Sequence, residues 1–145
     1  MSQAEKAVSC FKEGFMCSQA LLIAYADEFG MDRLTALKVS AAFGGGMGRM
    51  GDICGAVTGA FMVIGLKYGR TEVKDVESHE KTNRLVQEFV RRFKAVNESI
   101  VCRELLGCDL STKEGQKIFV ENKLRDNLCN KFVSDAAEIV GQLLT

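Results

Sequence analysis

The absence of proline is the feature that most constrains how this 145-residue chain folds. Proline interrupts helix interiors, so a chain of this length without it favours helices throughout. Apolar residues recur at spacings of three and four, and glycine, serine, aspartate and asparagine divide them into segments of helical length. The pattern predicts helices at about residues 2–12, 15–28, 32–41, 52–68, 74–96, 99–107, 112–125 and 127–143.

No segment predicts a strand. The stretch 60–66 has strand propensity, but the small residues that precede and begin it favour a buried helix. The content of 47% hydrophobic and 26% charged residues is typical of a globular domain, and the length suits one domain. We therefore expect an all-α fold: a compact single-domain bundle of about seven or eight helices spanning residues 1–145.

Three of the predicted helices have a distinct apolar face. The third presents Leu34, Leu37 and Ala41; the fifth presents Leu85, Val86, Phe89, Phe93 and Val96; the last presents Phe132, Val133, Ala136, Val140 and Leu143.

A glycine-rich loop at 44–51 precedes the central helix, and its five glycines in eight residues disfavour a regular helix. Gly51, Gly55 and Gly59 then recur every four residues, and small residues at that spacing let a second helix approach closely. We expect this partner helix to come from the same chain. The alternative is the same helix of a second subunit, which would make the protein a homodimer.

The charge balance argues against several classes of partner. Nineteen basic residues balance nineteen acidic ones, so the sequence gives no general electrostatic case for binding nucleic acid. The first residues lack the apolar core of a signal peptide. The longest apolar run, 53–66, is 14 residues, shorter than the roughly 20 of a membrane-spanning helix. We expect a cytoplasmic protein without a membrane partner.

The six cysteines are the main candidates for chemistry. In a cytoplasmic protein they are expected as free thiols, metal ligands or catalytic groups rather than permanent disulfides. No CxxC pair occurs, so a thioredoxin active site and a zinc ribbon lack their usual spacing. No CxxCH occurs either, which excludes covalently attached c-type haem.

Four of these cysteines fall in predicted first helical turns: Cys17 after Gly14, Cys54 after an Asp52 cap, Cys102 after a Ser99 cap and Cys129 after an Asn127 cap. Free backbone N–H groups at a helix start stabilise a thiolate, which is the form that attacks disulfides and binds metals. The alternative is that these positions arise by chance and that the cysteines are small core residues, a common use of cysteine. That alternative is the interpretation we favour for Cys10 and Cys108.

The glycine loop has two interpretations. Its backbone N–H groups can donate to an anion or to sulfur, which makes Gly44, Gly45, Gly46 and Gly55 candidate cofactor-contacting residues. Alternatively, it is a flexible connector. The loop lacks the Lys-Ser/Thr ending and the preceding strand of a phosphate-binding loop. Arg49 within it could face a thiolate, although a solvated arginine is the favoured interpretation.

The remaining polar candidates have simpler explanations. His79, the only histidine, lies in a charged stretch and is expected to be exposed, so a Cys–His catalytic pair has little support. Met47 and Met50 are expected to cover apolar surface. The basic run 91–94 is interpreted as a solvated helix face, with an acidic redox partner as the alternative.

The cysteine motifs resemble those of a known family. They are Gly14-Phe15-Met16-Cys17-Ser18-Gln19-Ala20, Phe43-Gly44-Gly45-Gly46-Met47-Gly48, Cys54-Gly55-Ala56-Val57-Thr58-Gly59, Cys102-Arg103-Glu104-Leu105-Leu106-Gly107 and Cys129. The chain resembles the redox-active family named for its cysteine pattern, C_GCAxxG_C_C, over nearly its whole length. One departure is that Gly55 follows Cys54, whereas the family name places a glycine before this cysteine, where Ile53 stands.

The resemblance implies a redox role for Cys17, Cys54, Cys102 and Cys129. A similar domain occurs in split-Soret cytochrome c, where an iron–sulfur centre accompanies haem. Four thiolates are the number that holds an iron–sulfur cluster. The resemblance does not identify the redox partner protein or a substrate, and leaves open whether the chain is an enzyme or a carrier.

Three hypotheses follow. In the first, the four cysteines transfer electrons, either as iron–sulfur ligands or as dithiol/disulfide pairs. In the second, they hold a structural zinc ion in a closed Cys₄ site. In the third, the chain is a helical interaction module whose cysteines only fill space.

Overall fold

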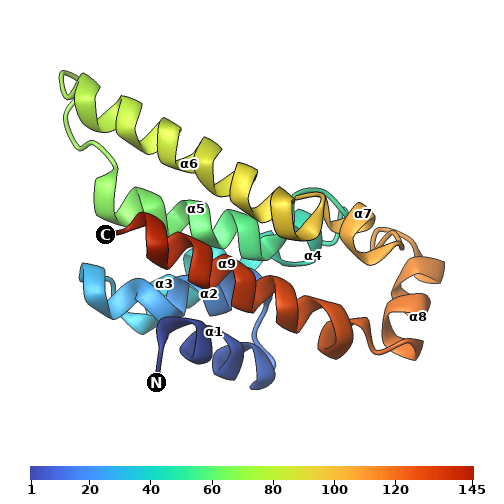
Figure 1. Ribbon diagram of the computed structural model, residues 1–145. Coiled ribbons are helices and arrows are strands. Elements are labelled where there is room, and N and C mark those ends of the chain that lie inside the picture. Colours follow the sequence, from blue (N-terminus) through green and yellow to red (C-terminus); the bar gives the residue numbers. More distant parts are fainter.

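The computed structural model describes all 145 residues and consists of helices joined by short loops (Figure 1). The helices are α1 (Gln3–Lys12), α2 (Cys17–Ala26), α3 (Arg33–Ser40), α4 (Gly44–Met47), α5 (Gly55–Tyr68), α6 (Val76–Asn97), α7 (Cys102–Leu106), α8 (Lys113–Glu121) and α9 (Asn130–Leu143). The expectation of an all-α bundle of seven or eight helices is confirmed: eight helices remain when α4, in which Gly45 and Gly46 have left-handed backbone angles, is set apart.

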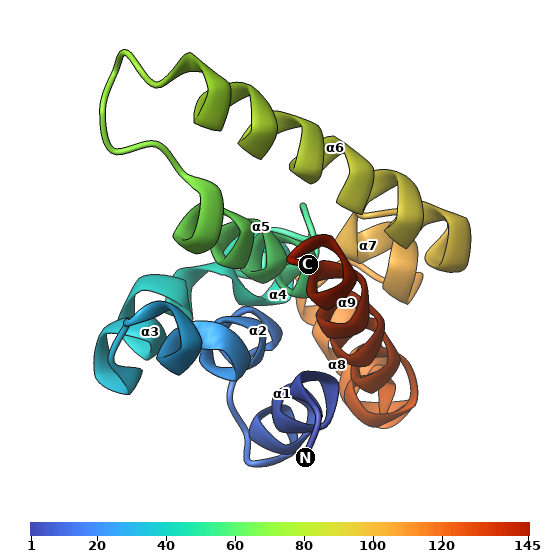
Figure 2. The ribbon, with the colours of Figure 1, turned by 60° about the vertical axis from the view of Figure 1, so that its left-hand side comes forward.

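The two central helices are α5 and α9. Figure 2 shows them between α6 on one side and α1 and α2 on the other. The packing of α5 against α2 is the most extensive between any two helices, followed by that of α9 against α1. The short elements α4, α7 and α8 gather at one end of the bundle, where α5 and α9 begin. The site described below lies at this end.

The small-residue face of α5 packs within the chain, as expected, but only Gly55 and Gly59 belong to it: Gly51 lies before the helix, with φ of 71°. A Cβ atom at Gly59 would lie 2.6 Å from the Cβ atom of Leu21, and one at Gly55 would overlap the Cys17 sulfur. Only glycine therefore lets α2 lie this close to α5.

The predicted apolar faces are correct in the core and wrong near the surface. All five predicted residues of α9 are buried, but Val96 of α6 is 56% exposed. On α3, Leu34 is 63% exposed, and the buried positions are Ala36 and Ser40. A polar contact holds this face of α3 against α2: the Ser18 hydroxyl donates to the Ser40 carbonyl at 2.8 Å. The periodicity of apolar residues does not reveal such a contact.

Three predicted helix starts are also wrong. Asp52 does not cap α5, and Ser99 does not cap α7. Residues 52–54 run extended beside 100–102 instead, where the Cys54 N–H donates to the Ile100 carbonyl at 2.8 Å. Asn127 does not cap α9, because it lies inside a π-helical turn, Arg125–Cys129, that runs directly into this helix. The sequence predicts Ser111 or Thr112 as the cap of the next helix, and Thr112 caps α8.

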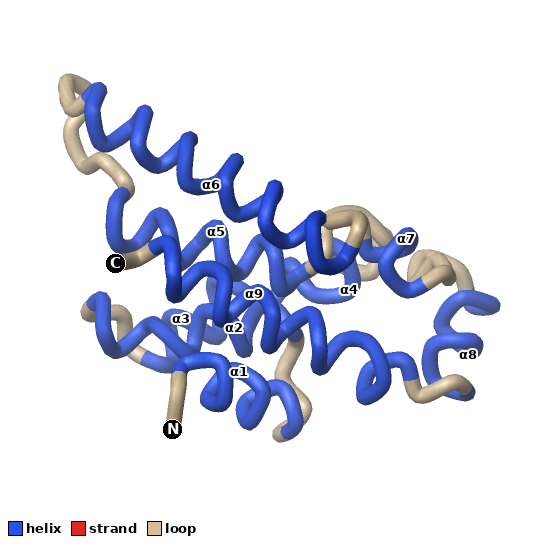
Figure 3. The backbone as a smooth tube through the Cα atoms, viewed as in Figure 1, coloured by secondary structure: helices blue, strands red, loops and turns tan.

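None of the helices combines the length and the apolar character that crossing a membrane requires. The tube in Figure 3 likewise contains only helices and loops.

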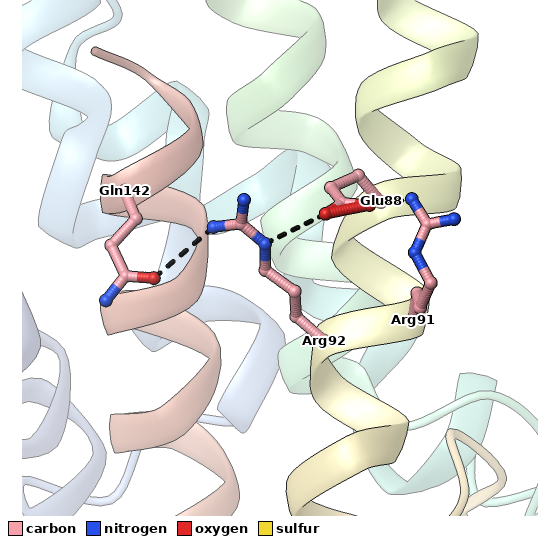
Figure 4. Close-up of polar contacts among 4 residues, drawn as sticks. All are labelled: Glu88, Arg91, Arg92 and Gln142. Carbon is pink, nitrogen blue, oxygen red and sulfur yellow. Dashed lines mark hydrogen bonds and ion pairs between the residues drawn. The ribbon is translucent and has the colours of Figure 1, made fainter.

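The basic run 91–94 lies on α6 as a solvated face around the buried Phe93. Arg91 and Arg92 both pair with Glu88, and Arg92 also donates to Gln142 of α9 at 3.4 Å (Figure 4). These contacts connect the surfaces of α6 and α9.

Tyr25 gives a test of the core between α2 and α9. Its buried hydroxyl donates to the Ala137 carbonyl at 2.8 Å. We expect Tyr25→Phe to lower the free energy of unfolding by about 1–2 kcal/mol, because the buried carbonyl loses its donor. Tyr68→Phe is the matched control: this hydroxyl bonds the Leu144 carbonyl at 3.3 Å, and Lys67 donates to the same oxygen. Urea unfolding measures the loss of free energy in each variant. Equal losses would contradict the conclusion that the Tyr25 hydrogen bond stabilises the core.

Candidate functional site

Four cysteines from four separate segments of the chain line one cavity of about 280 Å³. They are Cys17, Cys54, Cys102 and Cys129, and most of the remaining lining is apolar. The other two cysteines are buried elsewhere: Cys10 is 5% exposed in α1, and Cys108 is 8% exposed after α7. The fold thus gathers the four cysteines that the sequence motifs single out.

The relation of these cysteines to helix ends differs from the prediction in detail. Cys17 and Cys102 are the first residues of α2 and α7, and Cys54 is the N-cap of α5. Cys129 has helical backbone angles and continues the π-helical turn, so it does not lie at a free helix start. The argument from exposed N–H groups therefore does not apply to Cys129.

Cys17 and Cys54 form a hydrogen-bonded pair. The Cys54 thiol donates to the Cys17 sulfur, and this contact is the main reason why the pKa of Cys17 falls from 9.0 to about 7. Backbone N–H groups of Gly45, Ser18 and Cys17 itself act in the same direction. The pKa of Cys54 lies well above 9.0, because its proton is held in the contact with Cys17 and because it is buried. Of the two thiols, Cys17 therefore loses its proton first, and Cys54 keeps its own.

The other two cysteines favour the thiol form. Burial, followed by the negative charge of Cys17, raises the pKa of Cys102 to about 12. The same two causes raise the pKa of Cys129. The expectation of a lowered pKa at all four cysteines is therefore wrong. It holds only for Cys17, because each further thiolate would be buried beside an existing one.

The glycine loop forms a left-handed turn against this pair. Gly45, Gly46, Met47, Gly48 and Arg49 all have φ between 62° and 70°. Through this turn the Gly45 N–H reaches the Cys17 sulfur. A Cβ atom at Gly46 would lie 2.7 Å from the Cβ atom of Cys102. One at Gly44 would overlap Met16, just as one at Gly55 would overlap Cys17. Gly45 is thus a donor, and the other three glycines give the space in which the cysteines meet.

Two arginines lie in the cavity lining. Arg49 reaches it from the loop as an exposed residue. Sequence analysis missed the second, Arg125, which lies four residues before Cys129 on the π-helical turn. The sequence signal that could have identified Arg125 is its position four residues before the motif cysteine Cys129.

The remaining candidates lie outside the cavity. His79 is exposed on α6, as predicted. Neither Met47 nor Met50 lines the cavity, and Met50 is 58% exposed. Burial raises the pKa of both Cys10 and Cys108. Neither cysteine therefore has the properties of a reactive thiol.

The cysteines surround a space rather than a point. No three His, Cys, Asp or Glu side chains are grouped closely enough to bind a single metal ion. The arrangement places four cysteines around a cavity, and two of them form a hydrogen-bonded thiol–thiolate pair.

The pair predicts the pH dependence of thiol reactivity. In the metal-free reduced protein, alkylation of Cys17 by iodoacetamide is expected to be half-maximal near pH 7, while Cys102 stays protonated. Since folding lowers the pKa of Cys17, its contribution to stability is fully present above pH 9 and is lost as the pH falls through about 7. Peptide mapping after timed alkylation identifies the thiol, and Cys17→Ala should remove the transition. A midpoint near pH 9 would contradict the pairing.

One of the comparisons with known proteins gives a match. A family model described as "Putative redox-active protein (C_GCAxxG_C_C)" matches residues 15–143, which include all four cavity cysteines. The comparisons with curated proteins and with solved structures give no match. Because the family model covers most of the chain, this protein belongs to the C_GCAxxG_C_C family.

Proposed function

We propose that this chain is an electron-transfer protein and that Cys17, Cys54, Cys102 and Cys129 bind an iron–sulfur cluster. The observation that carries the proposal is that these four cysteines, and neither Cys10 nor Cys108, line one cavity. Four thiolates are the usual ligand set of [2Fe–2S] and [4Fe–4S] clusters, and a bound cluster would supply one-electron chemistry.

The residues around the cysteines suit such a ligand set. N–H groups of Gly45 and of the α2 start already donate to the Cys17 sulfur, and hydrogen bonds to ligand sulfur raise a reduction potential. Apolar side chains of Leu105, Leu106 and Leu110 limit water in the cavity. The raised pKa values of Cys54, Cys102 and Cys129 mean that ligation displaces protons, so assembly is favoured at alkaline pH.

The cluster suits the geometry better than zinc does. A closed zinc site requires four sulfurs about 2.3 Å from one ion. Since the side chains are not grouped around one point, a group that fills a cavity is the better match. A helical module without chemistry would have no need for the Cys17–Cys54 contact.

The Cys17–Cys54 contact favours a second candidate, dithiol/disulfide exchange. The Cys17 thiolate would attack one sulfur of a disulfide, forming a mixed disulfide and releasing one thiolate. Cys54 would then lose its proton and attack the Cys17 sulfur, releasing the second thiolate. The substrate disulfide gains two electrons, and Cys17 and Cys54 become a disulfide.

Anaerobic purification from iron-supplied cells tests both candidates. We expect iron and acid-labile sulfide in near-equal amounts, visible charge-transfer absorption, and loss of both in Cys54→Ser but not in Cys10→Ser. If the protein is metal-free and its thiols oxidise reversibly in pairs, the cluster proposal is wrong and dithiol/disulfide exchange takes its place. Zinc alone, or colourless unreactive thiols, would overturn both.

A further inference from the structure

Apart from the cysteines themselves, the charged residues that line the cysteine cavity are all positive. Of its 18 lining residues, the charged ones apart from the cysteine pair are Arg49 and Arg125, and none is aspartate or glutamate. Neither arginine has a carboxylate within ion-pair distance. Their charges are therefore not neutralised by a neighbouring side chain.

Arg125 is held in a defined position. Its Nη2 atom donates to the Phe15 carbonyl at 2.5 Å, and its guanidinium carbon lies 3.6 Å from the centre of the Phe11 ring. Phe15 is two residues before Cys17, and Cys129 follows Arg125 by four residues. The guanidinium is thus tied to the segments that carry two of the four cysteines. A π-helical turn, which is frequent at functional sites, supplies this placement.

The nearest acidic influence on the cysteines comes from outside the lining. Asp109 raises the pKa of Cys102, whereas the positive charge of Arg103 lowers the pKa values of both Cys102 and Asp109. Arg103 also donates to the Gly51 carbonyl at 3.1 Å, which holds its charge beside this loop. The positive charge of Arg49 and Arg125 therefore dominates the cavity.

We propose that Arg125, with Arg49 at the exposed rim, makes the cysteine cavity selective for an anionic occupant. The inference deepens the proposed function and rests on the cavity being the redox site. Four thiolates bring negative charge when they bind a cluster. An exchange reaction would select a small disulfide that carries carboxylates. Both occupants, the thiolate-bound cluster and the small disulfide, carry net negative charge.

Two alkylating reagents of similar size test this in the metal-free reduced protein. Iodoacetate is an anion and iodoacetamide is neutral, and each loses iodide as the Cys17 sulfur forms a new bond to carbon. The ratio of their rates cancels any common change in thiolate content or access. We expect Arg125→Gln to lower the iodoacetate/iodoacetamide ratio about five- to tenfold, because a charge near the entering carboxylate is removed.

Further variants keep the test decisive where Arg125→Gln perturbs the fold. Arg125→Lys should retain most of the ratio, and Arg49→Gln should lower it independently. Arg70→Gln should leave it unchanged, since Arg70 follows the far end of the 14-residue α5, about 20 Å from Cys54 and beyond the Debye length. A ratio that is the same in Arg125→Gln, Arg49→Gln and the unaltered protein would overturn the proposal.

A second measurement separates the two kinds of anion. If the purified protein contains a cluster, Arg125→Gln should make its midpoint potential more negative, since reduction adds negative charge near a lost cation. An unchanged potential with a lowered reagent ratio would assign the cavity charge to a small organic anion. The reagent ratio is measured in the metal-free protein. It therefore tests the charge selectivity of the cavity even if no cluster is found.

Discussion

Gly55→Ala is expected to lower the free energy of unfolding by about 2–3 kcal/mol and to displace Cys17 from its partner. The added methyl group would overlap the Cys17 sulfur and press on the Phe43 carbonyl, 3.1 Å away. α2 and α5 would have to separate, and the hydrogen bond from Cys54 would weaken. The pKa of Cys17 should then rise. Urea unfolding measures the first effect, and the pH midpoint of alkylation measures the second.

Gly65→Ala is the matched control on the same helix. A Cβ atom there has no neighbour within 4 Å, and alanine has the higher helix propensity. We expect Gly65→Ala to stabilise the protein by about 0.5–1 kcal/mol with no change in thiol reactivity. If both variants behave alike, close packing of α2 on α5 is not what positions Cys17.

Gly46→Ala has the second large expected effect, a loss of at least about 3 kcal/mol in unfolding free energy. Gly46 has φ of 70°, and a Cβ atom would lie 2.5 Å from the Asp52 nitrogen and 2.7 Å from the Cys102 Cβ atom. Two costs therefore combine: left-handed backbone in a residue with a Cβ atom, and overlap with the backbone that positions Cys102. The contribution that we propose for Cys102 to cluster binding should be lost with it.

Gly107→Ala separates these two costs. Gly107 has φ of 72°, but a Cβ atom added there would have no neighbour within 4 Å, so only the backbone cost of about 1–2 kcal/mol remains. Thermal unfolding of the two variants measures the difference directly. Equal losses would mean that the loop yields around Gly46 and does not fix Cys102.

The sequence predicted the features that depend on local patterns. Periodic apolar residues gave the all-α class and the buried face of α9, because a helix repeats its contacts within a few residues. The small residues of α5 predicted close packing within the chain, and Gly55 and Gly59 face α2. The predicted helix starts and the family resemblance each selected the same four of the six cysteines.

The tertiary structure decided the features that depend on distant segments. Residues 52–54 are extended because they pair with 100–102, so α5 begins at Gly55 rather than after Asp52. Cys17 meets Cys54 because α2 packs on α5. Arg125 joins the cavity because a π-helical turn redirects it.

The physical reason is the range of the interactions. Helix propensity, capping and amphipathic spacing act over a few residues and can be seen in the chain itself. The pKa of a cysteine and the charge of a cavity depend on burial and on neighbours tens of residues away. The sequence by itself therefore determined a helical bundle and its candidate cysteines. Only the tertiary structure determined which cysteine has the lowered pKa and that two arginines and no carboxylate line the cysteine cavity.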